Sequence, residues 1–466
     1  MMFGLPATLQ ALLTAFLWAT IPQKPDTSSI TFHLRHQHAA LNNSRIIFSD
    51  FSPEQSFSGT EAQFTIQTQD TKIPRPESLS AFHAARRNRE PGVTPALEWL
   101  DWEMATPDVT RRSTVLQMAK MAFNTYALDN STVGEWYDLS DEWASDPFGW
   151  QPEEDGMRGH IFVSTDNSTV IVAIKGTSAG WLVGGGGPTV AKDKKNDNLM
   201  FSCCCARVGP TWSTVCDCYS RGNRCDTDCV EEAMKEDGLF YPLGLNLYHN
   251  VTYLYPNANI WLTGHSLGGG LAALMGATFG APVVAFEAPA ERLASQRLHL
   301  PRPPSTHHIT HVYHTADPIP MGTCTGVTSL CAIGGFALET RCHLGQVVLY
   351  DTVQKLGWSA DVRNHPLKVI IDKILSDNAD WKDEFNGGIE LEEEKGWLSA
   401  LGWGWKRRRG EPSGGDGDEE KKPMREVPQA KPASEVEGVD GVCTDCYNWD
   451  FGSFKNITST NGARCT

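Results

Sequence analysis

The stretch Ala258 to Gly280, ANIWLTGHSLGGGLAALMGATFG, decides the fold class. Its first residues are apolar and typical of a short buried strand, while its last residues are small and apolar and predict a helix. The pentapeptide GHSLG, residues 264–268, lies between the two and fits the pattern G-x-S-x-G. A strand followed by a sharp turn and a helix indicates an α/β protein.

Steric and chemical requirements explain why Gly and Ser occur at these positions of the turn. Gly264 and Gly268 flank Ser266 at two positions on either side, where a side chain would strike the neighbouring strand or helix. The pattern fits the nucleophile elbow of α/β hydrolases, with His265 and Leu267 at its two variable positions, rather than an ordinary tight turn. The hydroxyl of Ser266 then lies at a helix N-terminus, where free N–H groups can receive an oxyanion. Ser266 is therefore the candidate nucleophile.

The length and net charge of the chain limit the classes of protein to which it can belong. The chain has 466 residues, of which 40% are hydrophobic and 21% charged, enough to bury the core of one large catalytic domain with appendages. Its formal net charge of −16 argues against nucleic acid as a partner. A lipid surface is not excluded by this charge.

Cysteines and glycosylation signals indicate the compartment. Seven of the 13 cysteines lie between Cys203 and Cys229, a spacing that fits disulfides or a zinc cluster. Together with the Asn-x-Ser/Thr sequons they favour the secretory pathway, disulfides and no metal. An odd number of cysteines leaves at least one without an intramolecular partner. The sequons begin at Asn42, Asn130, Asn167, Asn250 and Asn456.

The first 21 residues form an uncharged apolar run after the initiator. A membrane-spanning helix needs roughly 20 apolar residues, which this run just reaches. The run fits a cleaved signal peptide and an uncleaved membrane anchor equally well, and it has no preceding Lys or Arg to set an orientation.

Changes in composition divide the rest of the chain. Residues 22–92 are polar and expected to be loosely structured, apart from 44–51, which could form a strand. Residues 93–395 are expected to form the catalytic domain with a Cys-rich insertion at 203–229, and residues 396–442 a disordered linker. The final segment, 443–466, contains Cys and aromatic residues and is expected to dock onto the domain through a disulfide. The Gly-rich stretch 181–188 fits a hinged lid and a simple loop about equally.

Apolar runs at 161–164, 169–175, 282–286 and 309–314 read as strands, with a helix at 239–255. Strands that alternate with helices imply a mostly parallel sheet.

The remaining catalytic groups should follow the nucleophile in the order acid, then His. Asp317 ends the 309–314 strand and precedes Pro318, which suits the acid. The histidines at 307–314 come before Asp317 and have the wrong order, which leaves His343 and His365. We favour His365, because it lies in a turn before an apolar helix at 367–375 and can reach over the end of the sheet. His343 precedes a strand-like run and is the alternative.

An oxyanion hole needs two main-chain N–H groups directed at the developing charge. We expect one from Leu267, the residue after the nucleophile. The second is expected from Thr177, in the turn that follows the 169–175 strand.

With these residues placed, the chain resembles the class 3 lipases. The matching motifs are Ile174-Lys-Gly-Thr177, Gly264-His-Ser-Leu-Gly-Gly269 and Asp317-Pro318. One branch, the fungal autophagy-related vacuolar lipases, is closer still and is similar over about residues 93–380. The more specific blocks are SCCCARV at 202–208, VCDCY at 215–219, IWLTGHSLGG at 260–269, HTADPI at 314–319, RCHLG at 341–345 and VRNH at 362–365.

The resemblance implies an α/β-hydrolase fold of class 3 lipase type and a cofactor-free serine esterase with the triad Ser266, Asp317 and His365. It further implies a single-pass type II membrane protein, anchored by residues 1–21, with its catalytic domain in the lumen. Such a protein would reach the vacuole through multivesicular bodies and hydrolyse phospholipids and acylglycerols of membranes. An esterase, thioesterase or peptidase of the same fold, and a membrane-binding protein with a vestigial triad, are the rival hypotheses.

Overall fold

The computed structural model describes residues 29–40, 46–50, 63–87, 97–126, 137, 156–177, 190–207, 214–235, 239–326, 328–376, 427–439 and 441–454. The predicted anchor at 1–21, the Gly-rich stretch 181–188 and three sequons, Asn42, Asn130 and Asn456, lie outside these residues. In the part of the chain that is described, no helix is both long and apolar enough to span a membrane.

The opening stretch forms the centre of the molecule. Strand β9 (Asn259–His265) enters the turn and helix α8 (Leu267–Phe279) leaves it. Every residue of α8 is buried. Small residues allow this, because α8 packs directly on the sheet: a Cβ on Gly276 would lie 2.3 Å from a methyl group of Val283.

The main sheet has eleven strands in the order β13-β12-β11-β10-β9-β6-β5-β1-β3-β4, and β2 pairs with β1. The five strands from β6 to β12 in this order run parallel, and the pairs outside them are antiparallel. The remaining bounds are β1 (Ser29–Ala40), β2 (Ile46–Asp50), β3 (Gln63–Pro76), β4 (Trp99–Pro107), β5 (Arg158–Ser164), β6 (Thr169–Ile174), β10 (Val283–Phe286), β11 (Ile309–His314), β12 (Gln346–Tyr350) and β13 (Lys431–Pro432). The parallel centre agrees with the strands expected from the sequence.

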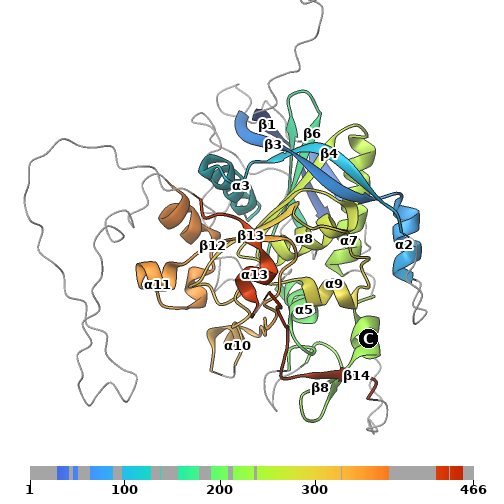
Figure 1. The fold of residues 1–466 in the computed structure, drawn as a ribbon, viewed down its shortest axis with the longest axis vertical. Coiled ribbons are helices and arrows are strands. Elements are labelled where there is room, and N and C mark those ends of the chain that lie inside the picture. Colours follow the sequence, from blue (N-terminus) through green and yellow to red (C-terminus); the bar gives the residue numbers. More distant parts are fainter. Residues whose placement is uncertain are drawn as a thin grey trace, which may run out of the picture.

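Helices cover both faces of this sheet, and Figure 1 shows α3 and α7 on opposite sides of it. Alternate residues of β6 face the two cores: Val170 and Val172 join one, and Ile171 joins the other. The first core is formed with α2 (Leu79–Arg87), α5 (Val190–Phe201), α7 (Phe240–Leu254), α8 and α9 (Arg292–Arg297). The second is formed with α3 (Arg112–Asn124), α12 (Leu367–Ile370) and η3 (Ile371–Leu375). Both faces are covered, as parallel strands require.

The possible strand at 44–51 is confirmed by β2, but the expectation that the rest of residues 22–92 is loosely structured is wrong for the described residues. This region supplies three strands of the main sheet and helix α2, and β1 pairs along its length with β5 of the catalytic domain. The polar composition did not predict β1 and β3, because main-chain pairing rather than a continuous apolar face holds these two strands in the sheet. In β3 the buried Ile66 and Ile73 enclose a polar run.

The prediction of disulfides is confirmed, since all twelve described cysteines are paired. The pairs are Cys203–Cys446, Cys204–Cys225, Cys205–Cys216, Cys218–Cys229, Cys324–Cys331 and Cys342–Cys443. Three of the pairs lie within the Cys-rich region, and Cys203–Cys446 links this region to the C-terminal segment. The region also contains β7 (Tyr219–Ser220), β8 (Arg224–Asp226) and α6 (Thr227–Ala233). The remaining cysteine, Cys465, lies outside the described residues.

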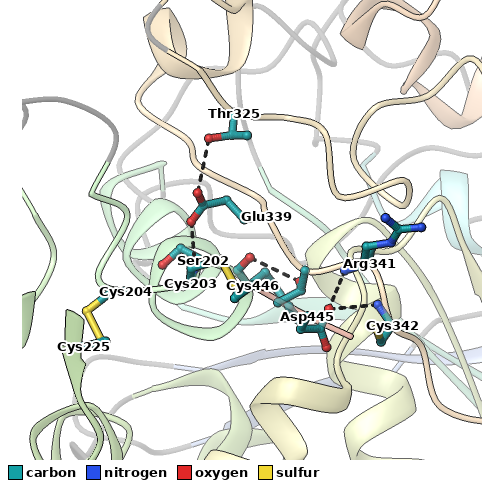
Figure 2. Close-up of a disulfide and its surroundings, with 12 residues drawn as sticks. Ser202, Cys203, Cys204, Cys225, Thr325, Glu339, Arg341, Cys342, Asp445 and Cys446 are labelled. Carbon is teal, nitrogen blue, oxygen red and sulfur yellow. Dashed lines mark hydrogen bonds between the residues drawn. A yellow bond between two sulfur atoms is a disulfide. The ribbon is translucent and has the colours of Figure 1, made fainter. Parts of the chain in front are cut away.

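The C-terminal segment docks by disulfides, as expected. Cys443 forms a disulfide with Cys342. Cys446 forms one with Cys203, and the Asp445 carboxylate accepts the main-chain N–H groups of Arg341 and Cys342 (Figure 2). Strand β14 (Asp450–Gly452) then pairs with β8 in a second, three-stranded sheet.

The prediction of disorder for 396–442 is wrong for residues 427–439. They form β13, which pairs antiparallel with β12 at the edge of the main sheet, and helix α13 (Ala433–Glu437). Their low-complexity composition gave no sign of order, because long-range contacts hold them. The other short helices are α10 (Leu330–Gly334), α11 (Thr352–Leu356) and η2 (Val362–Asn364).

Candidate active site

Ser266 occupies a strained turn between β9 and α8. Its φ of 55° and ψ of −130° lie in a region that residues with a side chain rarely adopt. The flanking glycines have no room for a side chain: a Cβ on Gly264 would lie 2.6 Å from the Gly268 carbonyl oxygen, and one on Gly268 would lie 2.3 Å from the Ile174 carbonyl oxygen. The close approach of β6 to the start of α8 therefore accounts for the G-x-S-x-G spacing.

Asp317 and His365 form a buried pair at the same end of the sheet. Asp317 follows β11, and its Oδ2 accepts a hydrogen bond from His365 Nδ1 at 2.6 Å. Its Oδ1 accepts the main-chain N–H of Ile319 at 2.9 Å. Burial by itself favours the neutral acid, but the charge and hydrogen bond of His365 hold the pKa of Asp317 below its usual value. Asp317 is thus an anion that orients the His365 ring.

Two further histidines fix the turn that carries His365. The ring of His265, in the elbow, donates from Nε2 to the His365 carbonyl at 3.0 Å. His314, at the end of β11, donates from Nε2 to the carbonyl of Asn364 at 3.1 Å. The Tyr126 hydroxyl lies 2.7 Å from His265 Nδ1 and is positioned to donate to it. Burial, reinforced by the nearby His365, lowers the pKa of His265 to about 3, so its ring stays neutral.

These contacts place His365 beside the elbow. The rings of His265 and His365 have centroids 4.7 Å apart, and Ser266 is the next residue after His265. The structure therefore gathers the three residues that the sequence nominated as a triad at one end of the parallel strands.

The turn after β6 packs on the same elbow. A Cβ on Gly176 would lie 3.1 Å from the Ser266 Cβ and 2.4 Å from the His265 carbonyl oxygen, which brings the next residue, Thr177, to the nucleophile. The Thr177 hydroxyl donates to Asp197 of α5. Leu267 is the first residue of α8, and its N–H is among those that have no acceptor within a helix. The two predicted oxyanion donors thus border Ser266.

His343, the alternative histidine, has different partners. Its Nε2 donates to the Ala288 carbonyl at 2.9 Å, and its Nδ1 pairs closely with Glu437 of α13. Burial opposes the charge, yet the Glu437 carboxylate raises the pKa of His343 to about 9. His343 therefore fastens the C-terminal segment, while Asp317 binds His365.

Two groups of potential metal ligands occur among the described residues. In the first, Cys205, Cys216 and Cys218, every sulfur is already part of a disulfide. The second contains His343, whose two nitrogens are both engaged, together with Glu291 and His311. Neither group offers a complete set of free ligand atoms.

Two sequons lie within the described residues. Asn167 is exposed in the turn between β5 and β6. Asn250 is exposed on α7, where its side-chain amide donates to the Asn246 carbonyl.

One buried acid near the site, Glu287, was not predicted from the sequence. Glu287 directly follows β10, is fully buried and has a φ of 43°. Its carboxyl interacts with that of Asp317. An acid directly after a buried strand that neighbours the elbow strand was the available indication.

The sequence is similar to a known family. The model of the family described as Lipase (class 3) matches residues 245–279. A protein of Cryptococcus neoformans var. neoformans serotype D (strain B-3501A), named "Putative lipase ATG15", is 47% identical over 385 residues, which cover 78% of this chain and 72% of that protein. Its namesake in Mycosarcoma maydis is 40% identical over 481 residues, which cover 96% and 90%.

Among solved structures, the Lip2 lipase of Yarrowia lipolytica is similar over 50% of this chain and 77% of its own, with 16% identity and a TM-score of 0.28. A triacylglycerol lipase of Penicillium expansum is similar over 53% and 82%, with 15% identity and a TM-score of 0.23. Because these TM-scores are low, the two structural similarities add nothing to the sequence relationship.

Proposed function

This chain belongs to the ATG15 family of class 3 lipases, and on that basis we propose that it is a serine lipase and phospholipase. Its substrates would be the carboxylic esters of membrane phospholipids and acylglycerols. The observation that carries the proposal is the buried Asp317–His365 pair held against the elbow that presents Ser266.

The reaction would proceed by acyl transfer. His365, oriented by Asp317, takes the proton of the Ser266 hydroxyl as its oxygen attacks the ester carbonyl. The tetrahedral intermediate collapses when His365 protonates the departing alcohol. Water, activated by the same His, then releases the fatty acid. Because Ser266 is held in one strained conformation, little ordering is needed when the ester arrives.

The main-chain N–H groups of Leu267 and Thr177 would stabilise the oxyanion. Leu267 lies at the N-terminus of α8, where the helix dipole adds to the attraction. The hydrogen bond from the Thr177 side chain to Asp197 would hold the second donor in place. Burial raises the pKa of Asp197 well above its usual value, so this acid adds no negative charge beside the oxyanion.

We place the protein in a lumen, as a type II membrane protein that reaches the vacuole through endosomes and multivesicular bodies and lyses autophagic bodies there. Six disulfides support an oxidising compartment. The name shared by its relatives supports a role in autophagy.

A comparison of substrates tests this function. Purified protein would be given phosphatidylcholine vesicles, a trioleoylglycerol emulsion, and soluble short-chain esters and thioesters, with Asp317→Asn as the inactive control. We expect fatty acid release from the vesicles and the emulsion, and a loss of that release in the variant. Activity confined to soluble esters or thioesters would assign the protein to another class of hydrolase.

A further inference from the structure

A second carboxyl group lies against Asp317 at the end of the parallel strands. Glu287 is the residue after β10, its side chain is fully buried, and its φ of 43° lies in the left-handed region that favours glycine. Its main-chain N–H donates to the Val312 carbonyl at 3.0 Å, so the next strand fixes this conformation. Burial of the carboxyl group and the strained backbone are both unfavourable, which indicates that the Glu287 side chain has a function.

The carboxyl oxygens of Glu287 lack the partners that a buried anion needs. Neither makes a regular hydrogen bond to a protein donor in the described part of the chain. The groups that face it are the Asp317 carboxyl, the main-chain N–H of His314 and the ring of His314, whose Nε2 lies 3.7 Å from Oε1. Tyr313 also lies close enough to interact with it electrostatically.

The charge balance at this place favours a protonated Glu287. Burial raises the pKa of Glu287 well above its usual value, and the neighbouring Asp317 carboxylate raises it further. Burial also lowers the pKa of His314, so that ring does not supply a compensating cation. Of the two carboxyls, Asp317 is the one that holds the anion, because it pairs with His365.

A neutral carboxyl has an O–H group to donate, and the adjacent acceptor is the Asp317 carboxylate. We propose that Glu287 is a positioning residue that, as a neutral acid, donates a hydrogen bond to Asp317 and so fixes the carboxylate that orients His365. This proposal rests on the proposed function of the triad. It extends the row of hydrogen bonds by one member, from Glu287 through Asp317 to His365, and Glu287 itself does not touch the substrate.

Two substitutions separate the hydrogen bond from the bulk of the side chain. Glu287→Gln keeps an N–H donor and is neutral at every pH, while Glu287→Met keeps the length and removes the donor. We expect kcat of Glu287→Gln on a soluble p-nitrophenyl ester to stay within about threefold of wild type. We expect Glu287→Met to lower kcat by about tenfold or more with KM unchanged, since a hydrogen bond to a charged group is lost.

The pH profile of kcat/KM tests the charge of Glu287. If the acid is neutral, Glu287→Gln leaves the acidic limb where it is in wild type. If it is ionised, Glu287→Gln removes a negative charge beside the triad and moves that limb to lower pH, which would overturn the proposal. Glu291→Gln is the matched control, because Glu291 is equally buried but binds the Leu344 N–H and His311 rather than the triad.

Two spectroscopic measurements do not depend on activity. The infrared difference between wild type and Glu287→Gln should contain the carbonyl band of a protonated carboxylic acid. The low-field proton resonance of the His365 Nδ1–H bound to Asp317 should persist in Glu287→Gln and shift or broaden in Glu287→Met. If the infrared difference instead contains a carboxylate band, or if Glu287→Met leaves both the resonance and kcat unchanged, the proposal is wrong.

These results stay distinct from a failure of the proposed function. If wild type hydrolyses no ester but the two spectra behave as expected, the function fails and the positioning role of Glu287 stands. Should Glu287→Met fail to fold, Glu287→Gly replaces it, because glycine suits the positive φ and also removes the donor. The same decrease in kcat and change in resonance are expected for that variant.

Discussion

The ring of His265 donates a hydrogen bond to the main-chain carbonyl of His365, with 3.0 Å between nitrogen and oxygen. The residue that precedes the nucleophile thus holds the residue proposed as its base, although 100 positions separate them in the chain. The elbow and the turn that carries His365 are therefore linked as one unit.

Replacing His265 should uncouple this unit. We expect His265→Leu to lower kcat by about tenfold to 100-fold, because the His365 turn loses its link to the elbow. Tyr126→Phe removes the donor to His265 Nδ1 and the acceptor for the Gly176 main chain, but it keeps the bond from His265 to His365 and should cost less. Steady-state kinetics on a soluble ester, with thermal unfolding to verify folding, measures both. Equal losses in the two variants would contradict this ranking.

The choice between the two candidate histidines can be tested directly. We predict that His365→Ala lowers kcat by about 10³-fold or more, since a triad member is removed. His343→Ala should retain most of kcat and lower the midpoint of thermal unfolding, because it breaks the contact with Glu437. The reverse pattern would transfer the role of base to His343.

The turn after β6, which contains the proposed oxyanion donor Thr177, can be tested by substituting Thr177 and Asp197. Thr177→Ala keeps the main-chain N–H but loses the hydrogen bond to Asp197, and should lower kcat by about tenfold. Asp197→Asn should stay within about threefold of wild type, because burial already keeps that acid neutral and the amide oxygen still accepts. A large loss in Asp197→Asn would mean that a charge is needed there.

The contact between His343 and Glu437 predicts how the docking of the C-terminal segment depends on pH. The pKa of His343 is raised to about 9, so its contribution to stability is complete below its ordinary value of 6.5 and is lost as the pH rises through 9. Although burial opposes it, His343 lowers the pKa of Glu437, whose contribution is present above its ordinary 4.5 and is lost at lower pH. The pair therefore stabilises most between these two ordinary values.

Hydrogen exchange of residues 427–439 measures this docking. We expect protection of their main-chain amides to be greatest at mildly acidic pH and to fall as the pH approaches 9. In Glu437→Gln the protection should be lower and nearly independent of pH over that range. Wild-type protection that stays constant up to pH 9 would show that the disulfides alone hold the segment.

Local patterns were enough to predict the centre of the molecule. The apolar runs at 169–175, 282–286 and 309–314 correspond to β6, β10 and β11 within one or two residues, because buried parallel strands are continuously apolar. The strand-Asp-Pro pattern indicated Asp317 and the turn before an apolar helix indicated His365, and a hydrogen bond joins these two side chains in the structure. Each of these features depends on only a few adjacent residues.

The missed features depend on residues far apart in the chain. Strand β1 is polar and is held by main-chain pairing with β5, more than a hundred residues later. Residues 427–439 are held by His343, which lies 94 positions from Glu437. The role proposed for Glu287 depends on its approach to Asp317, which the pairing of β10 with β11 brings about. Neither composition nor periodicity records such contacts.

The central claim is that Ser266 is the nucleophile of a lipid ester hydrolase. The most direct measurement is fatty acid release from phosphatidylcholine vesicles by wild type and Ser266→Ala, together with labelling of both by a fluorophosphonate. We predict that wild type releases fatty acid and is labelled once, at Ser266, while the folded variant does neither. Substantial hydrolysis by Ser266→Ala, or a label on another residue, would contradict this account.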